Sequence, residues 1–217
     1  MDYYALDEAL EYIQLVEEGA NMELTKKMRS TTKDYKAACK AATEAVKKHD
    51  FKAAKAKAKE ALKAAEDLQD YANNMKGETA SAFIGFFLGD LYTCCQAIVP
   101  MSIAIASAIG FTISSKMGAD EIRAVFSRVN YAASISEWLV TFFQWFRDVK
   151  QARENFFNDK KENDTYNYYR IKAQNYAKEL IKHTKNLDKM IERAEKKYEK
   201  KKKKKQLPCR LEGLQGF

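Results

Sequence analysis

The chain has 217 residues and a net charge of +8, with eight glycines and two prolines. Ala, Lys and Glu are abundant, and no long run alternates apolar with polar residues, so the composition excludes a sheet and favours helices joined by few turns. We therefore predict an all-α fold. It would be a multi-helix bundle, with a central apolar helical hairpin and long amphipathic or coiled-coil-like flanking helices.

Charge is unevenly distributed along the chain. Residues 1–24 contain seven acidic residues and no Lys or Arg, whereas residues 147–205 contain twenty basic and ten acidic residues. A basic half is attracted to anionic partners such as an acidic membrane, nucleic acid or an acidic protein surface. The acidic N-terminal segment could equally be its partner within the chain.

The cysteines indicate neither a disulfide framework nor a zinc site. Cys39, Cys94, Cys95 and Cys209 include no CxxC pair. The first 24 residues are acidic and amphipathic, unlike a secretory signal. We expect a reducing compartment or a membrane-associated location, and we expect no cofactor or metal.

Residues 1–77 are predicted to form an N-terminal unit of amphipathic helices. Apolar residues at helical spacing indicate a first helix over Asp2–Gly19, and a break near Gly19–Asn21 precedes a second amphipathic piece. Thr32–His49 and Phe51–Lys76 then form an Ala-rich hairpin, with Asp50 as the N-cap of its second helix.

This hairpin resembles a single tetratricopeptide-type unit over Tyr35–Leu68. The residues that carry the resemblance are Asp50 and Phe51 at the turn and the small residues Ala42, Ala54 and Ala61. The segment departs from that family because Glu66 replaces the closing proline and His49 the turn glycine, and because no second copy follows. We therefore expect a generic antiparallel hairpin.

Residues 78–118 are the apolar part of the chain. Between Thr79 and Ser115 the only ionisable carboxylate or amine is that of Asp90. Pro100 lacks a backbone donor and clashes with the preceding turn, so we predict two helices, Glu78–Ile98 and Met101–Lys116, folded as a hairpin.

Small residues recur every fourth position in both halves of this segment. They form the rows Ser81, Gly85 and Gly89, and Ser102, Ala106, Gly110 and Ser114. Such rows let two helices approach closely in a membrane-inserting hairpin, or in a hairpin buried within a bundle. Asp90 would be a pH-sensitive or pore-lining group in the first case. In the second it would be exposed, or paired with a lysine.

Residues 119–205 are predicted to form long aromatic and basic helices. Ala119–Phe157 carries an aromatic stripe, in which Trp138 and Trp145 indicate either core or an interfacial belt beside lipid. The last helix, about Asp164–Lys200, has a coiled-coil-like seam that includes His183. We expect His183 to be a satisfied core histidine or a mild pH sensor.

The helix continues into a lysine run that is a candidate contact for anionic lipid or phosphate. It consists of Lys200, Lys201, Lys202, Lys203, Lys204 and Lys205. The remaining tail, residues 206–217, differs in composition from the rest of the chain, and we expect it to be disordered.

No catalytic motif occurs in the sequence, so we expect no enzyme. The first hypothesis is a membrane-interacting or membrane-inserting protein, whose layout is similar to helical pore-forming toxins and colicin-type pore domains over Thr79–Ser115. The alternative is a structural or assembly component, for example of a virus particle. Its homo-oligomer or protein contacts would use the Ala-rich hairpin and the aromatic stripe. A further alternative is a basic nucleic-acid-binding protein.

Overall fold

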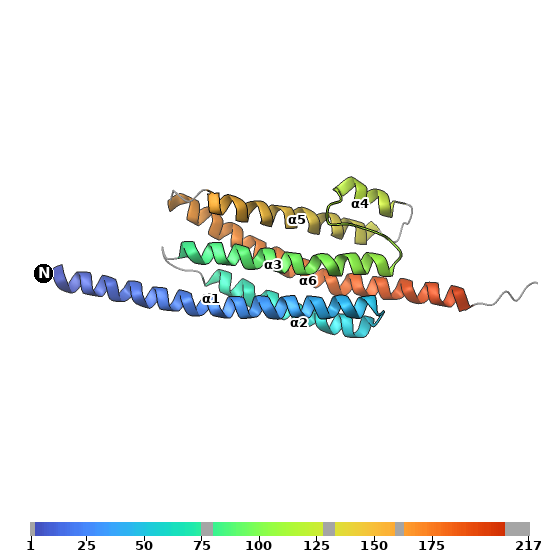
Figure 1. Ribbon diagram of the computed structural model, residues 1–217, viewed down its shortest axis with the longest axis horizontal. Helices are drawn as coiled ribbons and strands as arrows, with labels where there is room; N and C mark the ends of the chain where they lie inside the picture. Colours follow the sequence, from blue (N-terminus) through green and yellow to red (C-terminus); the bar gives the residue numbers. More distant parts are fainter. Residues whose placement is uncertain (1–2, 75–79, 128–132, 159–162, 207–217) are drawn as a thin grey trace, which may run out of the picture.

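The computed structural model describes residues 3–74, 80–127, 133–158 and 163–206, and over these residues it forms six α-helices and no strand (Figure 1). The prediction of an all-α multi-helix bundle is therefore confirmed. All six helices contribute buried side chains to one continuous hydrophobic core.

The N-terminal hairpin consists of α1 (Tyr3–Lys47) and α2 (Phe51–Asn73). As predicted, Asp50 is the N-cap of α2, and its side chain accepts a hydrogen bond from the Ala53 amide at 3.0 Å. The predicted break near Gly19–Asn21 is wrong, because α1 is continuous through it. One glycine costs a helix only about 1 kcal/mol, which a long helix tolerates.

The apolar segment forms one helix, α3 (Ala80–Ala108), and the predicted hairpin is wrong. Pro100 lies inside α3, and Pro100 and Gln96 are both exposed. The Gln96 carbonyl, which loses its helical donor to the proline, therefore faces the solvent side, where water can satisfy it. For this reason the proline does not end the helix.

The C-terminal half contains α4 (Ala119–Phe126), α5 (Ala133–Asn158) and α6 (Asn163–Gln206). The range Ala119–Phe157, which carries the aromatic stripe, is therefore divided between two helices, and α4 ends at a Ser127 cap whose amide bonds the Ala124 carbonyl. The basic helix α6 is longer than predicted. Beyond Gln206, the tail lies outside the described residues.

The central helix of the bundle is α3. It packs against α1, α5 and α6, while α2 lies between α1 and α6, and α4 packs on α5. The N-terminal part of α1 extends past the other helices at one end of the bundle (Figure 1). Because neighbours cover α3 from three sides, only one face of the apolar helix remains open to solvent.

Candidate functional site

The open face of α3 forms a stripe that is almost free of charge. Within α3, Asp90 is the only Asp, Glu, Lys or Arg. Exposed or half-exposed side chains recur at helical spacing along one face of α3, and they include Phe86, Asp90, Thr93, Gln96, Ala97, Pro100, Ile103 and Ser107. We call these residues the α3 stripe.

A row of basic residues on α1 borders this stripe. The row consists of Arg29, Lys33, Lys36, Lys40 and Lys47, all exposed and spaced by three, four or seven positions, so they share one helix face. The one acidic residue among them is Glu44, which pairs with Lys47 at 2.8 Å. We call this set the α1 basic row.

Two shallow grooves lie between α1 and α3. The first, of about 280 Å³, is lined on the α1 side by Lys36, Lys40, Thr43, Glu44 and Lys47, and on the α3 side by Thr93, Gln96, Ala97 and Pro100. The second, of about 510 Å³, lies between the end of α1 and the apolar residues Pro100, Ile103 and Ala104. Cations therefore stand directly beside an apolar floor.

Exposed aromatic rings, each with its own cation, occur where α3 and α6 begin and α5 ends. Phe86 is 48% exposed beneath the Arg29 guanidinium, at 4.8 Å from the ring centroid. Phe157 is 46% exposed with Arg153 at 5.6 Å, and Tyr168 is 53% exposed with Lys172 at 4.4 Å. Rings and cations in alternation suit the boundary between lipid and water. These helix ends lie at one end of the bundle (Figure 1), and we call them the aromatic end.

The two small-residue rows do not face each other, because both lie along one chain segment that does not fold back. Gly85 lies against Phe156 of α5, where an added Cβ would stand 2.8 Å from the ring, and Gly89 lies near Arg153. Ser102 and Ala106 are buried, Gly110 has φ +91° beyond the end of α3, and Ser114 is exposed after it. The side chain of Ser81 lies outside those described. The partner of the first row is therefore α5.

Asp90 is half-buried on the α3 stripe. Burial raises the pKa of its carboxyl, and the positive charge of Arg29 opposes that rise. Its Oδ2 atom is buried without a hydrogen bond in the described structure. The charge partner is therefore an arginine of α1, and the carboxylate remains incompletely satisfied.

The lysine run begins beside the C-terminal end of α3. Lys201 Nζ donates to the Ile109 carbonyl at 3.1 Å, and Lys197 lies over the Phe111 ring at 5.0 Å. Lys200, Lys202 and Lys203 are exposed, whereas the side chains of Lys204 and Lys205 lie outside those described. The run thus brings positive charge to the carbonyl end of the apolar helix, where the helix dipole favours cations.

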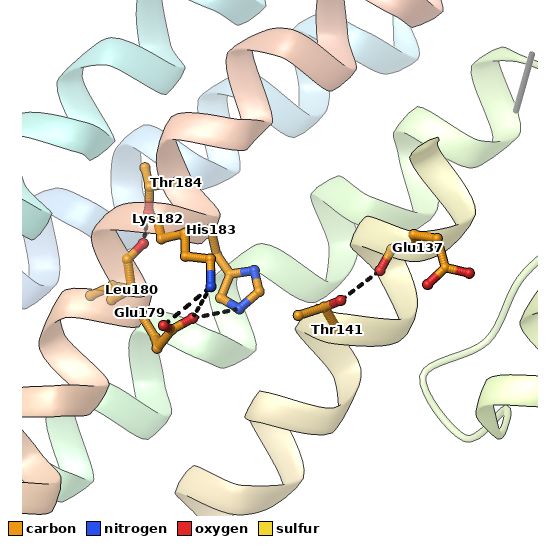
Figure 2. Close-up of polar contacts among 7 residues, drawn as sticks. All are labelled: Glu137, Thr141, Glu179, Leu180, Lys182, His183 and Thr184. Atoms are coloured by element: carbon orange, nitrogen blue, oxygen red, sulfur yellow. Dashed lines mark hydrogen bonds and ion pairs between the residues drawn. The ribbon is translucent and has the colours of Figure 1, made fainter. Parts of the chain in front are cut away.

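His183 of α6 is buried against α5 (Figure 2). Its ring lies 4.8 Å from that of Trp145 and 5.6 Å from that of Phe142, and the residue is 1% exposed. Within the described structure neither ring nitrogen has a hydrogen bond, and Nε2 lies 3.9 Å from Glu179 Oε2. Burial lowers the pKa of His183 to about 4, against the smaller effect of Glu179. The core position was predicted correctly, but the histidine is not satisfied there.

Trp138 and Trp145 are buried, so they belong to the core and do not form an interfacial belt. Cys39 of α1 and the adjacent Cys94 and Cys95 of α3 are free and buried as well. Burial raises the pKa of Cys39 to about 12, and it also raises the pKa of Cys94 and of Cys95 well above the usual value of a thiol. These three thiols are unreactive while α1 and α3 stay packed.

Sequence reasoning missed the α1 basic row and the aromatic end. The spacing of Arg29, Lys33, Lys36 and Lys40 was a visible signal for the row. No comparable signal indicates the cation–ring pairs of the aromatic end. Arg29 and Phe86 lie on two separate helices. Lys172 and Tyr168 lie on the same helix, but the sequence does not show that their face of α6 is exposed.

No protein family matches this chain, and no curated protein or solved structure shows detectable similarity to it. Within the described residues, one helical segment, Phe83–Ala108, is long and apolar enough to cross a membrane. Half of its most apolar window is buried in the bundle. Across the same part of the chain, no three His, Cys, Asp or Glu side chains gather closely enough to hold a metal ion.

Proposed function

We propose that this protein is a non-enzymatic, membrane-active helical protein. It docks on anionic bilayers through the α1 basic row and the aromatic end, and α3 is the segment that reaches lipid. The observation that carries the proposal is the juxtaposition of the uncharged part of the α3 stripe from Thr93 to Pro100 with Lys36, Lys40 and Lys47 across one groove.

Dimensions support this role for α3. At 1.5 Å per residue, its 26-residue segment Phe83–Ala108 extends about 39 Å, longer than a hydrocarbon core of about 30 Å. Each basic residue near an anionic surface contributes about 1 kcal/mol of attraction. The row therefore supplies the electrostatic half of binding and the stripe the apolar half.

The groove fits lipid better than nucleic acid. The floor between the lysines includes Ala97 and Pro100 beside the polar side chains of Thr43, Thr93 and Gln96, and the apolar part continues to Ile103. Ala97, Pro100 and Ile103 offer no donors or acceptors to base edges, whereas acyl chains need none. A nucleic-acid competitor separates the two partners in the experiment below.

The experiment is co-flotation at pH 7.5 with vesicles of phosphatidylcholine alone, or of phosphatidylcholine and phosphatidylserine in equal parts. The parent should float only with the anionic vesicles, even with duplex DNA in excess. The variant Lys36→Glu, Lys40→Glu should bind at least tenfold more weakly, because two attractive charges become repulsive.

The matched control is Lys59→Glu, Lys63→Glu on the exposed side of α2, which has the same spacing and the same change of charge. It should bind within about twofold of the parent, because those lysines lie away from the α3 stripe. Absence of the parent from the floating fraction would contradict the proposal. Equal losses in both double variants would contradict the assigned surface.

A further inference from the structure

The contact between α5 and α6 contains an ionisable group that has no hydrogen bond in the described structure, and its nearest carboxylate oxygen, Glu179 Oε2, lies 3.9 Å from His183 Nε2. His183 places an imidazole against Trp145 and Phe142, and both of its nitrogens lack hydrogen bonds in the described structure (Figure 2). A neutral imidazole fits this aromatic site. A protonated one would have two N–H donors and a positive charge, and Glu179 Oε2, at 3.9 Å from Nε2, lies beyond hydrogen-bond distance.

The surrounding charges do not compensate a proton on His183. The two that act on the ring are Glu179 and Lys182, both on α6, and Lys182 already bonds Glu179 at 3.1 Å. On the side of α5, the ring meets aromatic side chains, and the Glu137 carboxylate points away (Figure 2). Beside the adjacent Thr184, α1 places Tyr35, which is held neutral by burial.

The titratable groups that act on Tyr35 are buried thiols from α1 and α3, namely Cys39, Cys94 and Cys95, and burial keeps each of them neutral. The one carboxylate of α3, that of Asp90, is paired electrostatically with Arg29 and is not among the charges that act on His183. Solvent therefore stabilises a charged imidazole at His183 more than the neighbouring helices do.

We propose that protonation of His183 at mildly acidic pH releases α5 from α6 and uncovers α3 for the membrane. This inference rests on the proposed function and adds its trigger. Helix α5 covers α3 directly, because Phe156 packs on Gly85 and Phe146 stacks on Tyr92 at 5.6 Å. When α5 leaves, the apolar surface around the first small-residue row becomes available to lipid.

Proton linkage sets the size of the effect. We take a pKa of 6.5 for His183 in the released state and about 4 in the packed state. Protonation at pH 5 then multiplies the equilibrium constant between the packed and the released state by about 30, in favour of release. At pH 7.5 the same linkage is negligible. The release should therefore develop between these two pH values.

The first measurement uses the protein without lipid. Both tryptophans of the chain lie in α5, and Trp145 touches His183, so tryptophan emission reports this contact. The emission of the parent should shift to the red between pH 7.5 and pH 5. His183→Phe should abolish the shift, whereas His49→Asn, at the other histidine of the chain, should leave it unchanged.

Histidine nitrogen NMR on the unmodified parent keeps the inference testable if His183→Phe fails to fold. A His183 resonance that titrates near 6.5 without any change in tryptophan emission would overturn it. A titration that coincides with the red shift would support it.

The second measurement is vesicle binding at both pH values, with equal parts of phosphatidylcholine and phosphatidylserine. The parent should bind at least tenfold more tightly at pH 5 than at pH 7.5, and His183→Phe should keep the neutral binding but lose the increase. A red shift without binding at either pH refutes the membrane function alone. Binding at pH 7.5 with no red shift on acidification refutes the trigger alone.

Discussion

Tyr35 of α1 and Thr184 of α6 share a buried hydrogen bond of 2.8 Å, although 149 positions separate them in the chain. The Thr184 hydroxyl donates its own proton to the Leu180 carbonyl at 2.7 Å. The Tyr35 hydroxyl is therefore the donor between the two helices. This bond joins α1 to α6 next to His183, in a part of the core that the proposed release of α5 would leave packed.

Substitutions at this pair should differ in cost. Tyr35→Phe removes one donor and should lower the free energy of unfolding by about 1 kcal/mol, because Thr184 keeps its bond to Leu180. Thr184→Val leaves a fully buried tyrosine hydroxyl without this acceptor and should cost up to about 3 kcal/mol. Urea unfolding of both variants and the double variant measures their coupling. Strictly additive costs would show that the bond is not formed.

Two glycines on one face of α3 should respond differently to alanine. At Gly89 an added Cβ meets only Arg153, at 4.0 Å, so Gly89→Ala should raise the free energy of unfolding by up to about 1 kcal/mol through helix propensity. At Gly85 the new Cβ would stand 2.8 Å from the Phe156 ring. Gly85→Ala should therefore raise the free energy of unfolding by less than Gly89→Ala does, or should lower it. Thermal unfolding gives the comparison. Equal stabilisation by both would contradict the packing of α5 on α3.

Pro100→Ala should stabilise the bundle, because the substitution restores a backbone donor to an exposed position of α3. The gain should be roughly 1–3 kcal/mol, the cost of proline in a helix interior. If α3 must leave its neighbours to reach lipid, the same variant should insert into vesicles more slowly. Denaturant unfolding tests the expected gain in stability, and the kinetics of vesicle binding test the expected slower insertion. Loss of stability would show that Pro100 is needed for packing.

Acid should destabilise the folded protein through His183. Its pKa is about 4 in the folded state and 6.5 when unfolded, so the unfolded chain binds the proton more readily. Stability is therefore complete above pH 6.5 and is lost as the pH falls toward 4. At pH 5 the loss should reach up to about 2 kcal/mol relative to pH 7.5.

His183→Phe should remove this part of the pH dependence in urea unfolding. Asp90 acts in the opposite direction, because its raised pKa means that protonation favours the folded state. Asp90→Asn is therefore the control that should make the acid loss larger. An identical pH dependence in the parent and in His183→Phe would contradict the assignment.

The helical class and the α1–α2 hairpin could be predicted because their signals are local. Composition excludes a sheet, and Asp50 caps a helix whose alanines are spaced for one face. The hairpin at Pro100 was predicted wrongly because the cost of a helical proline depends on whether the freed carbonyl meets solvent. That exposure is set by α1 and α5, and the segment itself does not reveal it.

The candidate site required the fold for a similar reason. The α1 basic row can be read from spacing alone, yet nothing local indicates that it borders the uncharged stripe of α3. Likewise, the seam of α6 predicts that His183 is buried. That it has no partner follows from the aromatic side chains that α5 brings from about forty residues earlier in the chain.

The most direct test of the account is to locate the α3 stripe in the presence of a bilayer. Ser107→Cys places a thiol on the exposed stripe, in a chain whose Cys209, outside the described residues, is replaced by serine. Cys39, Cys94 and Cys95 are protected by burial, so an environment-sensitive dye labels position 107. The same dye at Lys63→Cys on α2 is the control.

With vesicles of equal phosphatidylcholine and phosphatidylserine, we predict that the dye at position 107 shifts to the blue and is quenched by lipids that carry a quencher in the acyl chain. The dye at position 63 should do neither. A dye at position 107 that remains in water while the protein is bound to vesicles would contradict the claim that α3 is the lipid-facing element.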